Sequence, residues 1–483
     1  MRFATIQRIL GLLLMCSAVT MLPPMLIALA LDESNHRDFS LTMLMVLVTG
    51  LVVWAPVRNR RQELRVRDGF VVVALFWIVL ALVGSLPFMF PEHPQMTFTD
   101  AIFESTSGLT TTGATVLTGI DDLPASIRFY RQELQWLGGM GIIVLAVAVL
   151  PMLGIGGMQL YRAETPGPMK DNKLTPRITE TAKALWYIYL GLTVSCAAGY
   201  WFAGMNLFDA VCHSFSTVAI GGFSTHDLSI GYFNSPAIEM VAVVFMLLAG
   251  VNFSLHYLSW RSMSVLTYFR DSEFKAYITV LGVTAVITVA YLNLSGTLPN
   301  IGDALHHGVF QVVSIGTTTG FTTAAYFHWP GFLPVMLLFT SFIGGCAGST
   351  GGGMKVIRFL LLFKQGIREI SRLVHPNAQI PVKVGGKAMP ERVVEAVWGF
   401  FATYVGCFTV MMLVLLATGL DQVTAFSAVA ACLNNLGPGL GEVGYHYGQL
   451  NDVAKWVLSM AMVLGRLEIF TLLVLLSPDF WRR

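Results

Sequence analysis

Ten apolar segments, each close to or above the roughly 20 residues that cross a bilayer as a helix, dominate the 483-residue sequence. Only 12% of the residues are charged, whereas an ordinary soluble domain carries roughly a quarter. The sequence therefore predicts an all-α polytopic membrane protein with ten transmembrane helices. The predicted segments are 8–31, 41–57, 69–90, 136–156, 180–204, 237–260, 275–296, 331–363, 393–419 and 453–477.

Positive charges are distributed unevenly between the two sides of the predicted helix bundle. The outside segments hold only Arg37, Arg128, Arg131 and Lys455, and most other Lys and Arg lie in connections on the opposite side. Because positively charged connections stay in the cytoplasm, both termini are expected to be cytoplasmic. The first apolar stretch is like a signal peptide, but its length favours a retained helix. The net charge of +2 gives no indication of a nucleic-acid partner.

Four connections rich in Gly and Thr follow short amphipathic stretches, and they can be aligned with one another. Taking Gly113, Gly222, Gly320 and Gly439 as equivalent gives a period of about 110 residues, which predicts four copies of one unit. Each unit is expected to contain a helix, a half-helix too short to cross the bilayer, a glycine loop and a second helix. The predicted divisions are an N-terminal helix pair at 1–68 and pore repeats at 69–160, 161–262, 263–388 and 389–483.

The glycine loops are expected to lie at membrane depth, where non-helical backbone is tolerated only if it is buried or lines a wet cavity. A dehydrated cation in such a cavity regains its ligands from backbone carbonyls. Glycine adopts the positive φ that turns successive carbonyls toward one axis. Four such loops around one pseudo-fourfold axis therefore predict a selectivity filter. The alternative is that these connections are merely rich in glycine and do not bind ions. The predicted filter residues are Thr111, Thr112, Gly113, Ile220, Gly221, Gly222, Thr318, Thr319, Gly320, Asn435, Gly437, Pro438 and Gly439.

The eighth apolar segment is interrupted by six glycines within residues 344–353. Each glycine costs up to about 1 kcal/mol relative to alanine, so the helix is expected to break in mid-membrane. The resulting loop would lie below the filter as a gate; a kink that permits close helix packing is the alternative. The predicted gate residues are Gly345, Gly348, Ser349, Thr350, Gly351, Gly352, Gly353, Lys355 and Arg466.

Two of these gate residues are cations with other interpretations. Arg466 lies inside the tenth segment, where a charge is costly and normally faces a partner or a wet cavity. A structural ion pair with Glu468 or with an external acid is the alternative for Arg466. Lys355 ends the loop, and its alternative is an ammonium group that reaches the cytoplasmic surface.

Other polar residues near the half-helices have simpler interpretations. Asp100 and Asp209 begin the first two half-helices and are expected to cap them. His306 and His307 precede the third glycine loop, and an interfacial role is favoured over metal binding. The basic stretch 355–392 is long enough to dock a cytosolic partner, with lipid headgroups as the alternative.

No catalytic motif is found in the sequence. There is no HExxH zinc motif and no GxxxxGK[ST] phosphate loop, and the six cysteines form no CxxC pair. The chain is therefore not predicted to be an enzyme, and no cofactor of its own is expected.

Several segments resemble the Trk/Ktr/HKT superfamily of K⁺ transporters: GLTTTGAT, AIGGFST, TTTGFTT, NNLGPGLG and the GGCAGSTGGGMK of 344–355. YRQELQWLGGMGI (130–142) and GRLEIFTLLVLL (465–476) are similar to its bacterial TrkH branch. The resemblance covers essentially the whole chain. It implies K⁺ uptake with K⁺ bound at the filter, K⁺ selectivity associated with Gly113, and an Arg466 that meets the glycine loop.

The same resemblance implies two protein partners. One is a second copy of the chain in a homodimer. The other is a cytosolic TrkA-like regulator with RCK domains, and NAD(H) or ATP/ADP is expected to bind that regulator. The surrounding lipid bilayer is the remaining expected partner.

Two other functions stay open on the sequence alone. The chain is also compatible with the ion-translocating subunit of an ATP-driven K⁺ pump or with an H⁺/Na⁺-coupled K⁺ symporter. Of the four glycine loops, the fourth is the least similar to a filter, because Pro438 lacks an N–H group. An asymmetric pore is therefore expected.

Overall fold

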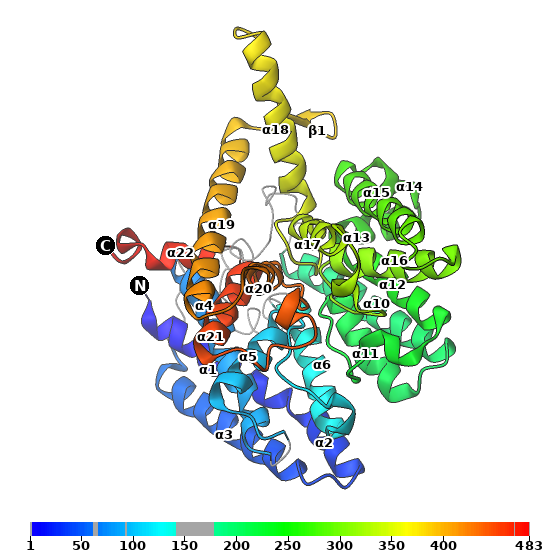
Figure 1. Ribbon diagram of the computed structural model, residues 1–483. Helices are drawn as coiled ribbons and strands as arrows, with labels where there is room; N and C mark the ends of the chain where they lie inside the picture. Colours follow the sequence, from blue (N-terminus) through cyan, green and yellow to red (C-terminus); the bar gives the residue numbers. More distant parts are fainter. Residues whose placement is uncertain (1, 61–65, 92–93, 142–177, 468, 483) are drawn as a thin grey trace.

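The computed structural model describes residues 2–60, 66–91, 94–141, 178–467 and 469–482, which are almost entirely helical (Figure 1). The N-terminal group contains α1 (Phe3–Val19), α2 (Leu22–Ala30) and α3 (His36–Trp54). The next two groups contain α4 (Val66–Met89), α5 (Phe98–Leu109), α6 (Ala125–Gly139), α10 (Ile178–Phe202), α11 (Leu207–Ala219), α12 (Pro236–Ala249) and α13 (Phe253–Ser262). The C-terminal half contains α14 (Leu266–Arg270), α15 (Ser272–Leu294), α16 (Ile301–Gly316), α17 (Leu333–Ile343), α18 (Val356–Val374), α19 (Glu391–Ala417), α20 (Gln422–Asn434), α21 (Asp452–Arg466), α22 (Ile469–Leu476) and α23 (Pro478–Trp481).

Each predicted repeat shows the same order of a long helix, a short helix, a loop and another helix. The short helices α5, α11, α16 and α20 contain only 12, 13, 16 and 13 residues. Such lengths are below the roughly 20 residues of a bilayer span. The four half-helices of the sequence analysis are therefore present in the structure.

The starts of the short helices differ from the prediction. Thr97 caps α5, and Asn206 caps α11, each by accepting a hydrogen bond from a backbone N–H. Asp100 and Asp209 are the donors of those N–H groups, so both lie at the third helical position and not at the cap. The prediction was wrong by three residues because a carboxylate in the first turn favours a helix start as a cap does.

The N-terminal helices pack closely because two glycines face the contact. A Cβ on Gly11 would lie 2.7 Å from Cβ of Trp54, and one on Gly50 would lie 2.8 Å from Cγ of Met15. The buried side chains of α1 and α3 continue into those of α4 and α6, for example Phe76. The N-terminal pair is thus joined to the first repeat by one apolar core.

The count of ten spans is not established by the described residues. Five helices are long and apolar enough to cross a membrane, and counting two bent helix pairs as single spans gives seven. The pair α12 and α13 is bent by 94°. The eighth segment is divided into α17 and α18, as predicted, and most of the fourth segment, 136–156, lies outside the described residues.

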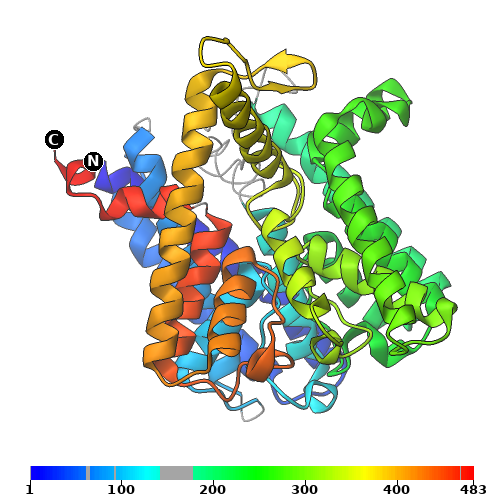
Figure 2. The same cartoon turned by 45° about the horizontal axis from the view of Figure 1, so that its top comes forward.

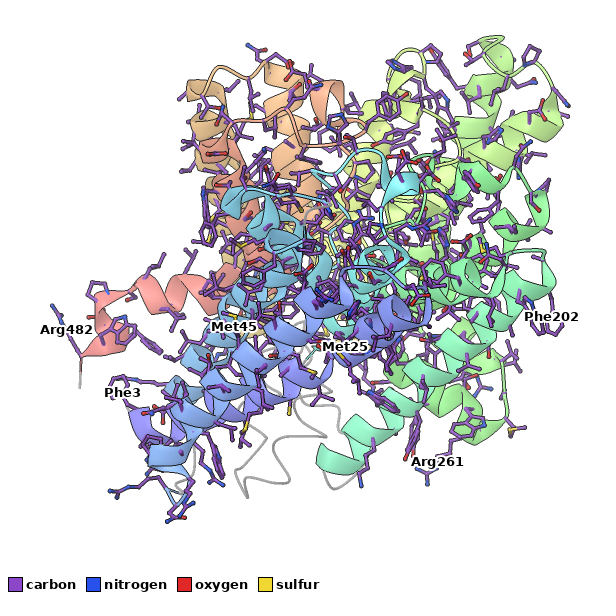
Figure 3. The ribbon with its side chains drawn as sticks, turned by 90° about the horizontal axis from the view of Figure 1, so that it is seen from below. Phe3, Met25, Met45, Phe202, Arg261 and Arg482 are labelled. Atoms are coloured by element: carbon purple, nitrogen blue, oxygen red, sulfur yellow. The ribbon has the colours of Figure 1, made fainter. Side chains whose placement is uncertain are left out.

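Large apolar side chains cover the periphery of the bundle. Leu294 and Phe202 are 85% and 83% exposed, and Figure 3 shows Phe202 at the outer margin of the helices. A soluble monomer rarely exposes apolar surface on this scale. The helices therefore present a surface suited to lipid.

The basic stretch after residue 355 forms α18 and a short hairpin. Strands β1 (Lys383–Val384) and β2 (Lys387–Ala388) pair antiparallel, with Lys383 opposite Ala388. Figures 1 and 2 show α18, the hairpin and the start of α19 extending beyond the other helices, and the two chain termini near each other.

Candidate functional site

The four glycine loops share one backbone pattern. Each contains a non-glycine residue with positive φ, followed two positions later by a glycine with positive φ. The non-glycine residues are Thr111 (53°), Ile220 (55°), Thr318 (70°) and Asn435 (54°). The glycines are Gly113 (80°), Gly222 (82°), Gly320 (86°) and Gly437 (92°). Positive φ is a real strain for β-branched residues, and strain repeated at four equivalent positions indicates a functional backbone geometry.

The glycines close into a ring. A Cβ added to any one of them would meet the carbonyl oxygen of the residue that precedes the glycine in the next loop. The contacts run from Gly113 to Gly221, from Gly222 to Thr319, from Gly320 to Leu436 and from Gly437 to Thr112. Because each loop touches the next and the fourth touches the first, the four repeats surround one axis, as the repeat pattern predicted.

The fourth loop has a different register from the one predicted. Gly437, and not Gly439, occupies the position of Gly113. Gly439 lies behind the ring, where its N–H donates to the carbonyl of Val443 at 3.0 Å. The sequence NNLGPGLG offers several glycines, and only the contact with Thr112 selects between them. Leu436 therefore belongs to the ring, although the sequence analysis did not include it.

The fourth loop also uses its carbonyls differently. The hydroxyl of Tyr447 donates to the Gly437 carbonyl at 2.6 Å, and that of Tyr326 donates to the Pro438 and Gly439 carbonyls at 3.3 and 3.2 Å. Among the described residues, no hydrogen bond reaches the carbonyls of the other three ring glycines. The ring is therefore asymmetric at the fourth loop, the loop for which Pro438 led us to expect asymmetry.

Loops one and three are the most alike. In each, the first and third threonines of the Thr-Thr-Thr run join their hydroxyls, Thr110 to Thr112 at 2.8 Å and Thr317 to Thr319 at 2.7 Å. The Asn435 amide from the fourth loop donates to the hydroxyl of Thr112 at 3.0 Å. Hydrogen bonds between side chains therefore hold the threonine runs in place, in addition to the backbone geometry.

Arg131, on α6, supports the outer side of the first two loops. Its guanidinium, fully buried, pairs with Glu104 of α5 at 2.8 Å and donates to the carbonyl of Ser224 at 3.0 Å. It also lies 4.2 Å from the ring centre of Phe223. From the sequence, Arg131 is predicted only as one of the outside charges. A buried charge needs a partner. The position of Glu104 inside the neighbouring half-helix was therefore the sequence signal that could have indicated this ion pair.

Gln135, one helical turn after Arg131, supports the second loop. Its amide nitrogen donates to the Gly221 carbonyl at 2.6 Å, and its amide oxygen accepts from Phe223 N at 3.1 Å. An amide can satisfy a carbonyl and an N–H of one loop at once. Gln135 therefore fixes the loop whose sequence departs most from the threonine pattern.

The interrupted part of the eighth segment forms a loop between α17 and α18. Gly352 N donates to the hydroxyl of Thr318 at 2.7 Å, and Gly353 N donates to the carbonyl of Asn434 at 3.0 Å. The hydroxyl of Thr350 donates to the carbonyl of Val218 at 2.9 Å. The loop thus contacts three of the four short helices, α11, α16 and α20, at or just after their C-terminal ends.

Arg466 joins this loop to the first repeat. Its guanidinium donates to the carbonyl of Thr350 at 3.0 Å and to those of Gly138 and Gly139 at 2.8 and 3.1 Å. The contact between Arg466 and the loop therefore exists. Glu468, the alternative partner, lies outside the described residues.

The remaining parts of the loop are attached to its surroundings. Lys355, predicted either in the gate or at the surface, is buried and donates from Nζ to the Gly351 carbonyl. The Gly348 carbonyl accepts from Phe253 N at 3.0 Å. Glu273 accepts from Ala347 N at 2.7 Å and from Ile357 N at 3.1 Å, so one carboxylate links the loop to the first turn of α18. A further loop contact involves Gly345, whose carbonyl accepts from Val356 N at 3.1 Å.

A histidine joins two repeats in the outer loops. His226 Nε2 lies 3.2 Å from Asp209 Oδ2, and its Nδ1 contacts Asp121 of the first repeat. Burial opposes a charge on this ring, but hydrogen bonds and charges from the two carboxylates outweigh it and raise the pKa of His226 above its usual value. This contact therefore favours the protonated form of the imidazole.

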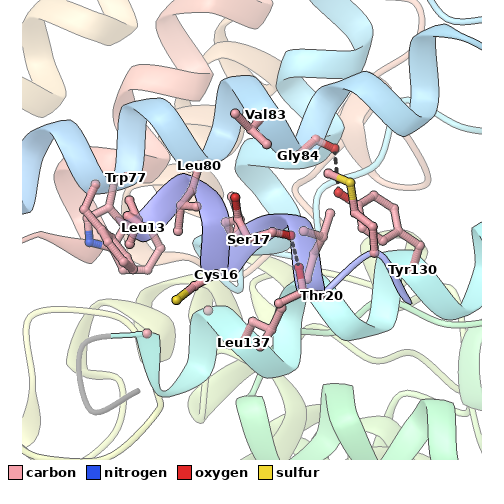
Figure 4. A pocket seen from close by; sticks show the side chains of 16 residues that line it. Leu13, Cys16, Ser17, Thr20, Trp77, Leu80, Val83, Gly84, Tyr130 and Leu137 are labelled. Carbon is pink, nitrogen blue, oxygen red and sulfur yellow. Dashed lines mark hydrogen bonds between the residues drawn. The ribbon is translucent and has the colours of Figure 1, made fainter. Parts of the chain in front are cut away.

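An apolar pocket lies between α1, α4 and α6, beside Arg466. Figure 4 shows Leu13, Trp77 and Leu137 around it, and the hydrogen bond from the Tyr130 hydroxyl to the Gly84 carbonyl at one end. Gly138, whose carbonyl accepts from Arg466, also lines the pocket. The pocket is therefore in direct contact with Gly138, whose carbonyl accepts a hydrogen bond from Arg466.

Comparisons with known proteins agree with this architecture. The profile of a family described as TrkH, Cation transport protein, matches residues 35–483. The chain is 59% identical to the Trk system potassium uptake protein TrkH of Vibrio parahaemolyticus and 57% identical to that of Escherichia coli K12, with all of both chains covered. It superposes on the crystal structure of the potassium transporter TrkH from Vibrio parahaemolyticus with a TM-score of 0.91, at 56% identity and full coverage of both chains.

The fold, its apolar periphery and these relatives define a multi-pass membrane transport protein, in agreement with the prediction that the chain is not an enzyme. The chain belongs to the TrkH family. The relatives are named as proteins of a Trk system, which indicates that they work with other components.

Proposed function

We propose that this chain takes up K⁺ across the bacterial inner membrane through the ring of four glycine loops. Its relatives at 57–59% identity are named potassium uptake proteins. The observation that carries the proposal is the closed ring of Gly113, Gly222, Gly320 and Gly437. Backbone carbonyls arranged around one axis replace the water shell of K⁺ without adding fixed charge.

The half-helices contribute to cation binding below the ring. Each ends immediately before its glycine loop, so its unsatisfied carbonyls and partial negative charge lie close to the axis. Four such ends favour a cation in the space beneath the filter. The carbonyl of Gly437 is engaged by Tyr447, so fewer complete sites and weaker rejection of Rb⁺ and Na⁺ are expected than in a symmetric filter.

We further propose that residues 344–355 are the gate and that Arg466 holds it closed. The loop contacts three half-helix ends, from the second, third and fourth repeats, and Arg466 connects the end of α6 in the first repeat to the same cluster. The guanidinium also places a positive charge below the filter, which opposes the passage of K⁺. Opening therefore requires the loop to leave Thr318, Asn434 and Val218.

The partners belong to the same proposal. The chain forms a homodimer, and a cytosolic TrkA-like regulator that binds NAD(H) or ATP/ADP acts on it. With both termini in the cytoplasm, α18 and the hairpin extend on the cytoplasmic side. Lys364, Arg368 and Arg372 lie on α18 and suit an acidic regulator surface.

Ion flux through purified protein in liposomes tests the filter. Gly113→Ser is expected to raise Na⁺ flux relative to K⁺ flux, because the ring carbonyl beside it can no longer approach as closely. An unchanged ratio would count against the filter assignment.

The same liposomes test the gate. Deletion of 346–353 and Arg466→Ala are each expected to raise K⁺ flux in the absence of the regulator. Arg261→Ala, at an exposed arginine on α13, is the matched control and should leave flux unchanged. The gate proposal fails if neither the deletion nor Arg466→Ala changes the flux.

Imposed gradients distinguish the alternative functions. K⁺ flux that follows only its own gradient supports channel-like uptake, and flux driven by an H⁺ or Na⁺ gradient supports a symporter. A requirement for ATP hydrolysis by another subunit would support the pump alternative.

A further inference from the structure

Three potential metal ligands from two repeats meet at the outer ends of α12 and α16. Glu239 lies in the first turn of α12, and His306 and His307 are neighbours on α16. One ligand atom from each side chain lies within 4.8 Å of the others. The two helices lie side by side, so the cluster joins the second repeat to the third (Figure 1).

One carboxylate oxygen in this cluster is buried without a hydrogen bond. Glu239 is only 3% exposed, and its Oε2 has no hydrogen-bond partner among the described residues. Nε2 of His306, which is also without a hydrogen bond, lies 2.8 Å from that oxygen. A buried carboxylate oxygen without a hydrogen bond is costly, and an ion pair alone can leave much of that cost in place.

The distances fit a shared ion. Zn²⁺ takes imidazole nitrogens and carboxylate oxygens at about 2.0–2.2 Å, so neighbouring ligands of one ion lie roughly 3 Å apart. The separation between Glu239 and His306 is close to that spacing. His307 needs only to turn its free nitrogen toward the same point.

His307 is already oriented by a neighbour. Its Nδ1 lies 3.1 Å from the hydroxyl of Thr323, and Nε2 is the nitrogen left for a ligand bond. A metal-bound histidine normally has its other ring nitrogen held in this way. Thr323 follows Gly320 by three residues, so the contact also connects the cluster to the third glycine loop.

We propose that Glu239, His306 and His307 bind one divalent transition-metal ion of the Zn²⁺, Co²⁺ or Ni²⁺ type. Two imidazoles and one carboxylate suit these ions, whereas Mg²⁺ and Ca²⁺ prefer oxygen ligands alone. The side chain of His306 is 28% exposed, which gives the ion access from solvent. Water completes the coordination, and the ion ties α12 to α16 independently of the ring that carries K⁺.

Metal titration of the tag-free, full-length protein in detergent tests the site. After treatment with a chelator, calorimetric titration with ZnCl₂ is expected to show one site per chain that Mg²⁺ does not occupy. Glu239→Gln and His307→Ala are each expected to weaken Zn²⁺ binding by about tenfold or more. His328→Ala, at an exposed histidine in the next outer loop, is the matched control and should bind as the wild type does.

A second measurement on the wild type guards against variants that fail to fold. Co²⁺ added to the metal-free wild type should give d–d absorption bands that Zn²⁺ abolishes, and Zn²⁺ should raise the midpoint of thermal unfolding. The proposal is overturned if the wild type gives no such bands and no Zn²⁺ shift. Folded Glu239→Gln and His307→Ala variants that bind Zn²⁺ as tightly as the His328→Ala control would overturn it equally.

Discussion

The buried ion pair between Arg131 and Glu104 offers a sharp test of how the outer loops are held. Arg131→Met removes the charge and keeps much of the apolar stem. Among the residues that the structure describes, Glu104 then keeps hydrogen bonds from the hydroxyl of Thr115 at 2.9 Å and from the N–H of Val116 at 3.0 Å. Removing one partner of a buried pair costs about 3–5 kcal/mol, because the other charge stays buried. Because two donors to Glu104 remain, the expected loss of unfolding free energy is about 3 kcal/mol, at the lower end of this range.

The free energy of unfolding is measured by titration with sodium dodecyl sulfate in mixed micelles. All samples contain the same K⁺ concentration, because an ion bound to the folded state stabilises it. Glu104→Gln alone should also destabilise the protein, since it leaves the Arg131 guanidinium without its counterion.

The double variant decides whether the two side chains act as a pair. In the double variant Glu104→Gln with Arg131→Met no charge is left buried, so its loss should fall short of the sum of the single losses by about 2 kcal/mol. A loss below about 1 kcal/mol for Arg131→Met would refute the reasoning. So would strict additivity of the two substitutions.

Three other predictions concern the ring and the outer loops. Gly437→Ala should abolish K⁺ flux, because its φ is positive and its Cβ would lie 2.7 Å from a backbone oxygen. Gly439→Ala should retain flux, because φ at Gly439 is not positive and its Cβ would meet the Val443 side chain, at 2.6 Å, and not the backbone of another loop; equal effects would contradict the register. Tyr447→Phe should increase K⁺ over Na⁺ selectivity by freeing a ring carbonyl, and an unchanged flux ratio would contradict this. Because the pKa of His226 is raised in the folded protein, its stabilisation is complete below the ordinary pKa of about 6.5 and is lost as the pH rises through the raised value. The difference in unfolding free energy between wild type and His226→Gln should therefore shrink as the pH rises above about 6.5, and a constant difference would contradict the assignment.

The sequence predicts those features that depend on local chemistry. Apolar runs predict helices in a bilayer, and the break at 344–353 follows from the helix-forming cost of its glycines. The four half-helices and their glycine loops repeat at a detectable period, so the fourfold arrangement was predictable. The prominence of Gly113, Gly222 and Gly320 was predictable for the same reason.

Only the tertiary structure decides which atoms meet across the axis. Gly437 takes the fourth place because it contacts Thr112, a residue more than three hundred positions away, and nothing local separates it from Gly439. Arg466 meets Thr350, and Arg131 meets Glu104, through equally long-range packing. Local composition determines that a loop forms, whereas the register of a ring depends on the distances between four loops, which exist only once the helices have packed.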